Sequence, residues 1–199
     1  MSRVSVDTVL TPAQQQRRQR ILDAAVALAA EGGYDAVQMR EVALRADVAL
    51  GTLYRYFSSK EHLLVSALAG EVAGIRERLA ERPPRGADDA ERVMDVIRRS
   101  MRSLQRQPNV IAAMLKSLIS TGPGVGESVR PIGAEMTGIV VNAMRHDNPA
   151  SADHDRDVAH VIQQVWLASL LWWVAGRSPA SVVEENIARA VRLLLSDRD

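Results

Sequence analysis

The stretch from Val37 to Lys60 constrains the fold more than any other part of the chain. Its sequence, VQMREVALRADVALGTLYRYFSSK, predicts two short helices joined by a tight turn, followed by a second break and a new helix start. The second short helix contains small residues, a hydroxyl group and two tyrosines separated by one arginine. Such a surface can lie in the major groove of duplex DNA, so the segment predicts a helix-turn-helix.

The composition favours an all-α protein with a substantial core. Hydrophobic residues make up 47% of the chain and aromatic residues 4%, and β-branched alternation is rare. The absence of cysteine excludes disulfides and thiolate chemistry. The longest apolar run, residues 165–176, is shorter than the roughly 20 residues that span a bilayer. Because the first residues also lack the apolar segment of a secretory signal, we expect no membrane partner and a cytoplasmic location.

Capping residues and helix breakers predict where the helices begin and end. Thr11 followed by Pro12 predicts the first start, and Gly32 with Gly33 the first stop. Ser58 with a glutamate three residues later predicts a capping box. The expected helices are 12–30, 39–46, 50–57, 60–80, 88–106, 108–119, 127–145, 153–175 and 179–195. They predict a flexible N-terminus (1–10), a helix-turn-helix domain (11–59) and a larger domain (60–199).

Several residues of the predicted helix-turn-helix have side chains suited to contact DNA. Gly51 permits close approach of the duplex, and Thr52 has a hydroxyl for a base edge and a methyl for thymine. Tyrosine hydroxyls can reach phosphates, as can basic side chains at a helix start. The alternatives are an ordinary helical hairpin with its tyrosines in the core, and arginines on a solvated face. The candidate DNA contacts are Arg17, Arg18, Gln38, Arg40, Gly51, Thr52, Leu53, Tyr54, Tyr56 and Lys60.

Residues 16–68 resemble the N-terminal DNA-binding domain of the TetR family of regulators. The motifs that carry the resemblance are ILDAA at 21–25, GY at 33–34, VA at 42–43, ADV at 46–48 and LYRYF at 53–57. The resemblance implies three helices that hold the recognition helix and a fourth that leads into a larger domain. Two positions depart from the family pattern, where a glycine often precedes the turn valine and a serine or threonine follows it. Here these are Asp47, which tolerates a left-handed backbone, and Ala49, which has no hydroxyl for a phosphate.

The helix expected at 153–175 is apolar nearly all round its second half, so it must be buried on more than one side. The resemblance implies that the last two helices form a four-helix interface in a homodimer. A two-fold dimer would place two recognition helices one DNA turn apart, on a palindromic operator in double-stranded DNA. The alternative is a helix in a monomeric core. The candidate interface residues are Val161, Val165, Leu170, Ile187, Val191 and Leu194.

Methionines and tryptophans are concentrated in the C-terminal part of the chain. Flexible thioethers suit a pocket that adapts to a large apolar ligand, although plain core filling is the alternative. The resemblance is strongest to TetR-family regulators of cholesterol catabolism. It implies an apolar small-molecule effector, a steroid or its coenzyme A thioester. The candidate pocket residues are Met101, Leu104, Met114, Leu118, Met136, Trp166 and Trp173.

No residue pattern favours catalysis, a metal or a cofactor. His146, His154 and His160 lack the spacing of a zinc site, no nucleophile–base set is visible, and the glycines at 122–126 lack the lysine of a P-loop. We therefore predict a ligand-responsive transcriptional repressor that is not an enzyme. The alternatives are a helical ligand-carrying protein or small enzyme that uses an apolar C-terminal cavity, and a helical interaction module.

Overall fold

The computed structural model describes residues 10–122, 124–144 and 152–195, and all regular structure in these ranges is α-helical. The helices are α1 (Pro12–Ala36), α2 (Met39–Arg45), α3 (Leu50–Tyr56), α4 (Lys60–Glu81), α5 (Asp89–Leu104), α6 (Pro108–Leu118), α7 (Val125–Ala143), α8 (Ala152–Val174) and α9 (Ala180–Leu195). The all-α prediction is confirmed. The predicted N-terminal segment, apart from Leu10, and His146 lie outside the described residues.

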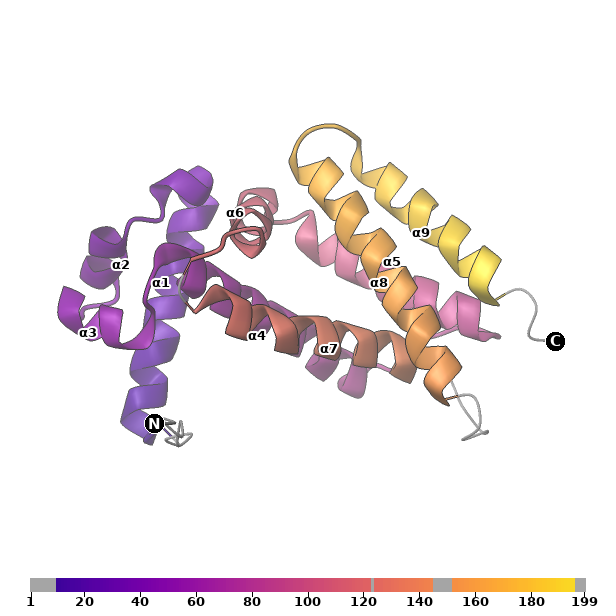
Figure 1. Cartoon of the computed structure of the whole chain (residues 1–199), viewed down its shortest axis with the longest axis horizontal. Helices are drawn as coiled ribbons and strands as arrows, with labels where there is room; N and C mark the ends of the chain where they lie inside the picture. The colour runs from indigo at the N-terminus through magenta and orange to yellow at the C-terminus, as the bar shows by residue number, and fades with distance from the viewer. Residues whose placement is uncertain (1–9, 123, 145–151, 196–199) are drawn as a thin grey trace.

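The helices form an elongated molecule with a small group of helices at one end. In Figure 1, α1, α2 and α3 lie together at the left, and α8 and α9 lie at the right. Helices α4 and α7 pack against each other along the length between these ends, and α6 packs on α1. Helix α4 therefore connects the helix-turn-helix to the larger group of helices. Within the described residues no helix is long and apolar enough to cross a membrane.

The boundaries of the first helix follow local capping chemistry, with one correction at its end. The Thr11 side chain accepts a hydrogen bond from the Gln14 backbone N–H, and the Gln14 side chain accepts from the Thr11 N–H, which makes a capping box. The expected stop at the two glycines is a kink: Gly32 and Gly33 are non-helical, Gly33 has φ of 68°, and one more helical turn follows to Ala36. That last turn carries Tyr34 back towards α4.

The turn between α2 and α3 is set by a left-handed residue. Asp47 has φ of 52° and is the only non-glycine residue with positive φ in the described part of the chain. Short polar side chains tolerate this conformation better than others, as predicted for the position. The turn brings Val42, Leu53 and Phe57 together in a core with no more than 1% of any of these side chains exposed.

The start of α4 differs from the predicted capping box. Ser59, not Ser58, is the N-cap, and its side chain accepts a hydrogen bond from the His62 backbone N–H at 3.1 Å. Ser58 instead faces the His62 ring, with both its backbone nitrogen and its hydroxyl 3.2 Å from Nδ1. The one-residue shift leaves Lys60 as the first helical residue, directly after the recognition helix and its exit loop.

Candidate DNA interface and effector cavity

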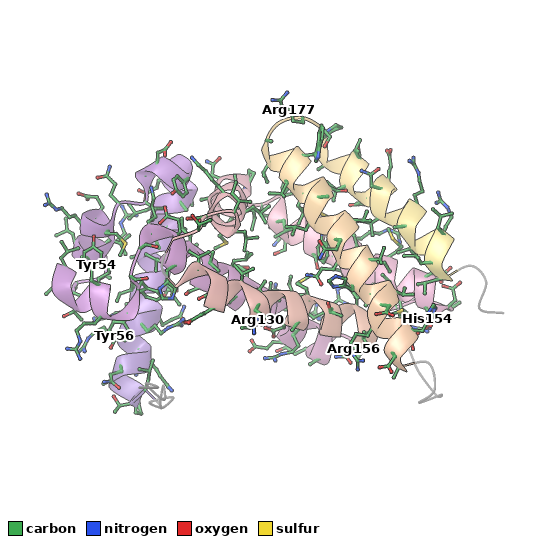
Figure 2. All side chains as sticks on the ribbon, in the orientation of Figure 1. Tyr54, Tyr56, Arg130, His154, Arg156 and Arg177 are labelled. Atoms are coloured by element: carbon green, nitrogen blue, oxygen red, sulfur yellow. The ribbon has the colours of Figure 1, made fainter. Side chains whose placement is uncertain are left out.

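Four of the ten predicted DNA contacts lie at least partly exposed on α3. Gly51 is exposed, and a Cβ placed there would have no atom within 4 Å, so this part of α3 is open to an approaching duplex. Tyr54 is 50% exposed, and Thr52 and Tyr56 are half-buried. Figure 2 shows both tyrosines at the end of the molecule formed by α1–α3. Ala49 is the N-cap of α3 and makes no side-chain capping bond, as its sequence position predicts.

Leu53 is wrong as a predicted DNA contact. Its side chain is 0% exposed and lies in the core between α1, α2 and α3. Gly51, Tyr54 and Arg55 are the exposed residues of α3, and at about 100° per residue Leu53 lies on the opposite side of the helix from this exposed face. Leu53 therefore anchors the recognition helix to the hydrophobic core.

The other predicted contacts flank α3 on two sides. Gln38 is the N-cap of α2, and both Gln38 and Arg40 are exposed. Arg17 and Arg18 lie in the second turn of α1, so they belong to a helix and not to a flexible arm. The Arg18 guanidinium lies 5.3 Å from the centre of the Phe57 ring, and its burial lowers the pKa of Arg18. This contact fixes Arg18 against the core of the helix-turn-helix.

Lys60 is held by Tyr34, a residue to which the sequence assigned no function. The Lys60 ammonium lies 3.7 Å from the centre of the Tyr34 ring and donates a hydrogen bond to the Tyr34 carbonyl at 3.3 Å. Lys116 of α6 approaches the same ring at 4.1 Å. The Tyr34 hydroxyl donates to Glu61. Burial, together with the Glu61 carboxylate, raises the pKa of Tyr34 to about 12, so the phenol stays protonated at neutral pH.

His62 occupies the junction between the helix-turn-helix, α4 and the start of α7. Its ring packs edge-on against Phe57 at 5.6 Å between centres. A Cβ on Gly124, which precedes α7, would lie 2.8 Å from Nδ1 of His62, so only glycine fits this close approach. Burial, and then the positive charge of Arg18, lower the pKa of His62, while Glu127 acts in the opposite direction.

A large cavity lies among α4, α6, α7 and α8. Its volume is about 960 Å³, at the upper end of the range for small-molecule sites. Aliphatic and aromatic side chains form most of its wall, and four of the predicted pocket residues line it: Leu104, Leu118, Met136 and Trp166. Lining residues that the sequence did not indicate include Leu68, Val72, Ile75, Ile111, Leu115 and Leu167.

Three predicted pocket residues do not line the cavity. Met101 and Met114 are both 0% exposed and fill the core instead. Trp173 is partly buried and packs against the core outside the cavity lining. Core filling, the alternative for these residues, is therefore correct for the two methionines.

Polar and charged residues interrupt the apolar wall along α7 and α8. Thr137 and Gln163 lie on facing helices and make a hydrogen bond of 2.6 Å. Arg130 and Arg156 are exposed residues of the lining, and Figure 2 shows both on the same side of the molecule along the lower edge of the view. Arg156 also pairs with Asp153 at 2.7 Å. The cavity thus combines an apolar interior with charged groups where it meets solvent.

The outer face of α8 and α9 carries exposed apolar side chains. Trp172 is 62% exposed, Leu193 is 78% exposed and Val161 is 45% exposed. Val165 and Leu193 line a shallow groove between the two helices. Three predicted interface residues are wrong: Ile187 and Val191 are buried in the chain's own core, and Leu170 lines the cavity among α4, α6, α7 and α8. Leu194 is half-buried.

Two family models match separate parts of the chain. Residues 21–67 match the model "Bacterial regulatory proteins, tetR family", and residues 86–194 match "Tetracyclin repressor-like, C-terminal domain". The chain belongs to the TetR family. Its relatives are transcriptional regulators, and the prediction of a regulator instead of an enzyme is confirmed.

Similar proteins of known sequence or structure match nearly the whole length of this chain. The HTH-type transcriptional repressor KstR of Rhodococcus jostii is 44% identical over 191 residues, which are 96% of this chain and 88% of that protein. The crystal structure of a TetR transcriptional regulator from Rhodococcus sp. RHA1 has a TM-score of 0.83 at 30% identity and covers 94% of this chain and 100% of that one. Thermus thermophilus FadR in complex with lauroyl-CoA has a TM-score of 0.69 at 22% identity, with 92% and 95% covered, and shows the shared fold.

The stability of the regulator should fall as His62 becomes protonated. The folded state lowers the pKa of His62 below its ordinary value of 6.5, so the unfolded chain binds a proton more readily. The stability from neutral His62 is therefore complete above about pH 6.5 and is lost as pH falls through the folded pKa. Urea unfolding at pH 7.5 and pH 5.5 measures this loss, which should be smaller in His62→Gln.

His160→Gln is the matched control, since His160 is an exposed histidine on α8. This variant should keep the pH dependence of the wild type. Equal pH dependence in the wild type and His62→Gln would contradict the role of His62.

Proposed function

We propose that this regulator is a homodimeric repressor that binds a palindromic operator and is released by a steroid-derived effector. The observation that carries the proposal is the course of α4. The helix begins at Lys60, next to the recognition helix, and further along it contributes Leu68, Val72 and Ile75 to the cavity wall. One rigid helix thus contacts both the effector and the base of the DNA-binding surface.

On the DNA side, the exposed residues of α3 have distinct roles. Gly51 and Thr52 meet base edges in the major groove, where a glycine permits approach and a hydroxyl can donate or accept. Tyr54, Tyr56 and Lys60 bind phosphate oxygens and fix the register of α3. Gln38 and Arg40 add contacts from the start of α2, and Arg17 from α1. Arg18 contributes charge from its fixed position on Phe57.

The second copy of the chain covers α8 and α9. Exposed apolar groups of this size are unusual on a monomer and mark an interface. Trp172 and Leu193 are the anchors of this surface, with Val161 and Val165 beside them. The core residues Ile187 and Val191 hold α9 against its own chain, so the surface that meets the partner is rigid. In a two-fold dimer each subunit contributes one recognition helix to a palindromic operator.

The effector is a large apolar molecule with an anionic group. The volume of the cavity and its aliphatic wall suit a steroid skeleton. Arg130 and Arg156 at the solvent side suit the phosphates of a coenzyme A thioester, because guanidinium groups pair well with phosphate. The likeness to KstR supports genes of cholesterol or lipid catabolism as targets, and the lauroyl-CoA complex of the FadR neighbour supports a thioester. Occupation of the cavity favours a dimer geometry that no longer matches the operator.

Binding to a palindromic operator duplex should depend on salt and on Lys60. Lys60→Ala removes one phosphate contact, so affinity falls and the slope of log K against log salt becomes shallower by about one. The same substitution removes the contact of the ammonium with Tyr34, and the change in slope distinguishes the lost phosphate contact from that structural effect. Tyr56→Phe removes a neutral contact, so it weakens binding with little change in slope. Fluorescence anisotropy at several salt concentrations measures both quantities.

Arg177→Ala is the matched control for the lost charge. Figure 2 shows Arg177 in the loop between α8 and α9, far from α3, so this variant should bind DNA as the wild type does. Absence of duplex binding by the wild type at low salt would overturn the repressor and favour a ligand-carrying protein. Unchanged affinity in both Lys60→Ala and Tyr56→Phe would contradict the phosphate roles.

A steroid-acyl coenzyme A thioester should raise the melting temperature and release the operator. A ligand that binds only the folded state stabilises it by about 2.7 kcal/mol at 100 times its Kd. Gly138 lines the cavity and has open space at its Cβ, so Gly138→Phe fills the cavity without a clash at the backbone. This variant should bind the operator, and the thioester should neither raise its melting temperature nor release the DNA. Stabilisation without DNA release would contradict induction.

Charged substitutions at the α8–α9 surface should separate the subunits. Trp172→Glu and Leu193→Glu place carboxylates in an apolar interface while each site tolerates them in a monomer, because both side chains are exposed. Analytical ultracentrifugation should show a monomer, and operator affinity should fall at least tenfold as the two half-sites are no longer bound together. Ile119→Glu, at a 75% exposed apolar residue at the C-terminal end of α6, is the control. A dimer in both variants would place the interface elsewhere.

A further inference from the structure

We infer that Thr137, Gln163 and Gly133 form a polar subsite in the cavity wall that binds a carbonyl oxygen of the effector. The inference rests on the proposed function, in which the cavity takes an apolar effector. It adds a requirement to the chemistry of that molecule: an uncharged oxygen that accepts a hydrogen bond, at a fixed place along α7 and α8.

The geometry leaves the Gln163 amide with free donors. The Thr137 hydroxyl lies 2.6 Å from Oε1 of Gln163 and 3.0 Å from the Gly133 carbonyl. A hydroxyl has one proton, and the shorter contact assigns it to Oε1 of Gln163. The Nε2 group of Gln163 then keeps two N–H donors, and among the described residues it donates to no acceptor.

Gly133 keeps the space beside this amide open. A Cβ on Gly133 would lie 3.4 Å from Nε2 of Gln163, in van der Waals contact with the amide, and would occupy the space beside it. Glycine inside a helix costs about 1 kcal/mol relative to alanine, and Gly133 lies in the middle of α7. The missing side chain gives an incoming group access to the amide.

Because the rest of the cavity wall is mostly apolar, this amide favours an effector with a carbonyl over a pure hydrocarbon. Both Thr137 and Gln163 are only half-buried, so water solvates the amide while the cavity is open. An effector that fills the cavity displaces that water. A pure hydrocarbon leaves the amide donors unpaired, at a cost of about 1–3 kcal/mol, whereas a carbonyl replaces the lost hydrogen bond. Thr137 and Gln163 carry no charge, so they match a neutral oxygen, while Arg130 and Arg156 remain for anionic groups.

Two carbonyls of a steroid-acyl thioester satisfy this chemistry, a ring ketone and the thioester carbonyl. Three probes distinguish them: a steroid-acyl coenzyme A with a ring ketone, the same molecule with a methylene in place of the ketone, and the ketone compound with a thioether in place of the thioester. Titration calorimetry gives the Kd of each for the wild type and for Gln163→Leu, which keeps a side chain of similar size without donors.

Gln163→Leu should weaken binding about tenfold for probes that keep the recognised carbonyl, which is one typical hydrogen bond. The probe without that carbonyl should bind both proteins equally, and this probe identifies the source. Gly133→Ala should weaken the same probes, because its methyl group crowds the amide. Gln19→Leu, at an exposed glutamine of α1 that does not line the cavity, is the matched control and should leave every Kd unchanged.

Failure of the polar subsite and failure of the proposed effector would give different results. An equal change, or no change, in the Kd of all three probes in Gln163→Leu would overturn the polar subsite and leave the proposed effector standing. Binding of none of the probes by the wild type, which still binds its operator duplex, would overturn the steroid-acyl effector and the subsite with it.

Discussion

The contact of Tyr34 with two lysines is the interaction on which the arrangement of the domains depends. Tyr34 comes from the last turn of α1, Lys60 from the start of α4 and Lys116 from α6, and both ammonium groups lie on its ring. Two like charges share one ring because its π face is negative and because Glu61 accepts from its hydroxyl. Burial acts in the opposite direction, but the hydrogen bond from Tyr34 lowers the pKa of Glu61 and keeps it ionised. The cluster joins three helices at one point.

This junction lies directly between the two surfaces to which we assign function. Lys116 follows the cavity-lining Leu115 on α6, and Lys60 begins α4, the helix whose middle turns line the same cavity. Asn109 of α6 adds a hydrogen bond of 3.4 Å to the Ala30 carbonyl of α1. A change in the position of α6 or α4 therefore reaches the helix-turn-helix through packed side chains and not through a flexible linker. Cores of this density transmit small shifts as rigid movements.

Much of the fold could be predicted from the sequence, because its signals are local. The capping box at Thr11, the left-handed Asp47 and the missing hydroxyl at Ala49 each depend on a few neighbouring residues. The predicted α3 contacts follow from residue types and from the family resemblance, and Leu53, which helical periodicity turns inwards, was placed on the wrong face. At the start of α4, Ser58 and Ser59 are equivalent caps by residue type, and the backbone alone decides between them. The role of Tyr34 has no local signal, since it depends on residues 26 and 82 positions away.

The faces of α8 and α9 could not be assigned from sequence for a different reason. Both helices are apolar on the side that meets their own core and on the side that meets solvent. Helical periodicity therefore does not decide which apolar side is buried within the chain. The positions of the tryptophans do not identify the buried face of α8, because Trp166 lines the cavity while Trp172, six positions later, is 62% exposed. Six residues advance an α-helix by about 600°, which is 240° beyond one full turn, so these two tryptophans must lie on different faces. Because Trp166 lines the cavity, this rotation points Trp172 away from the cavity and towards the surface that we assign to the second subunit.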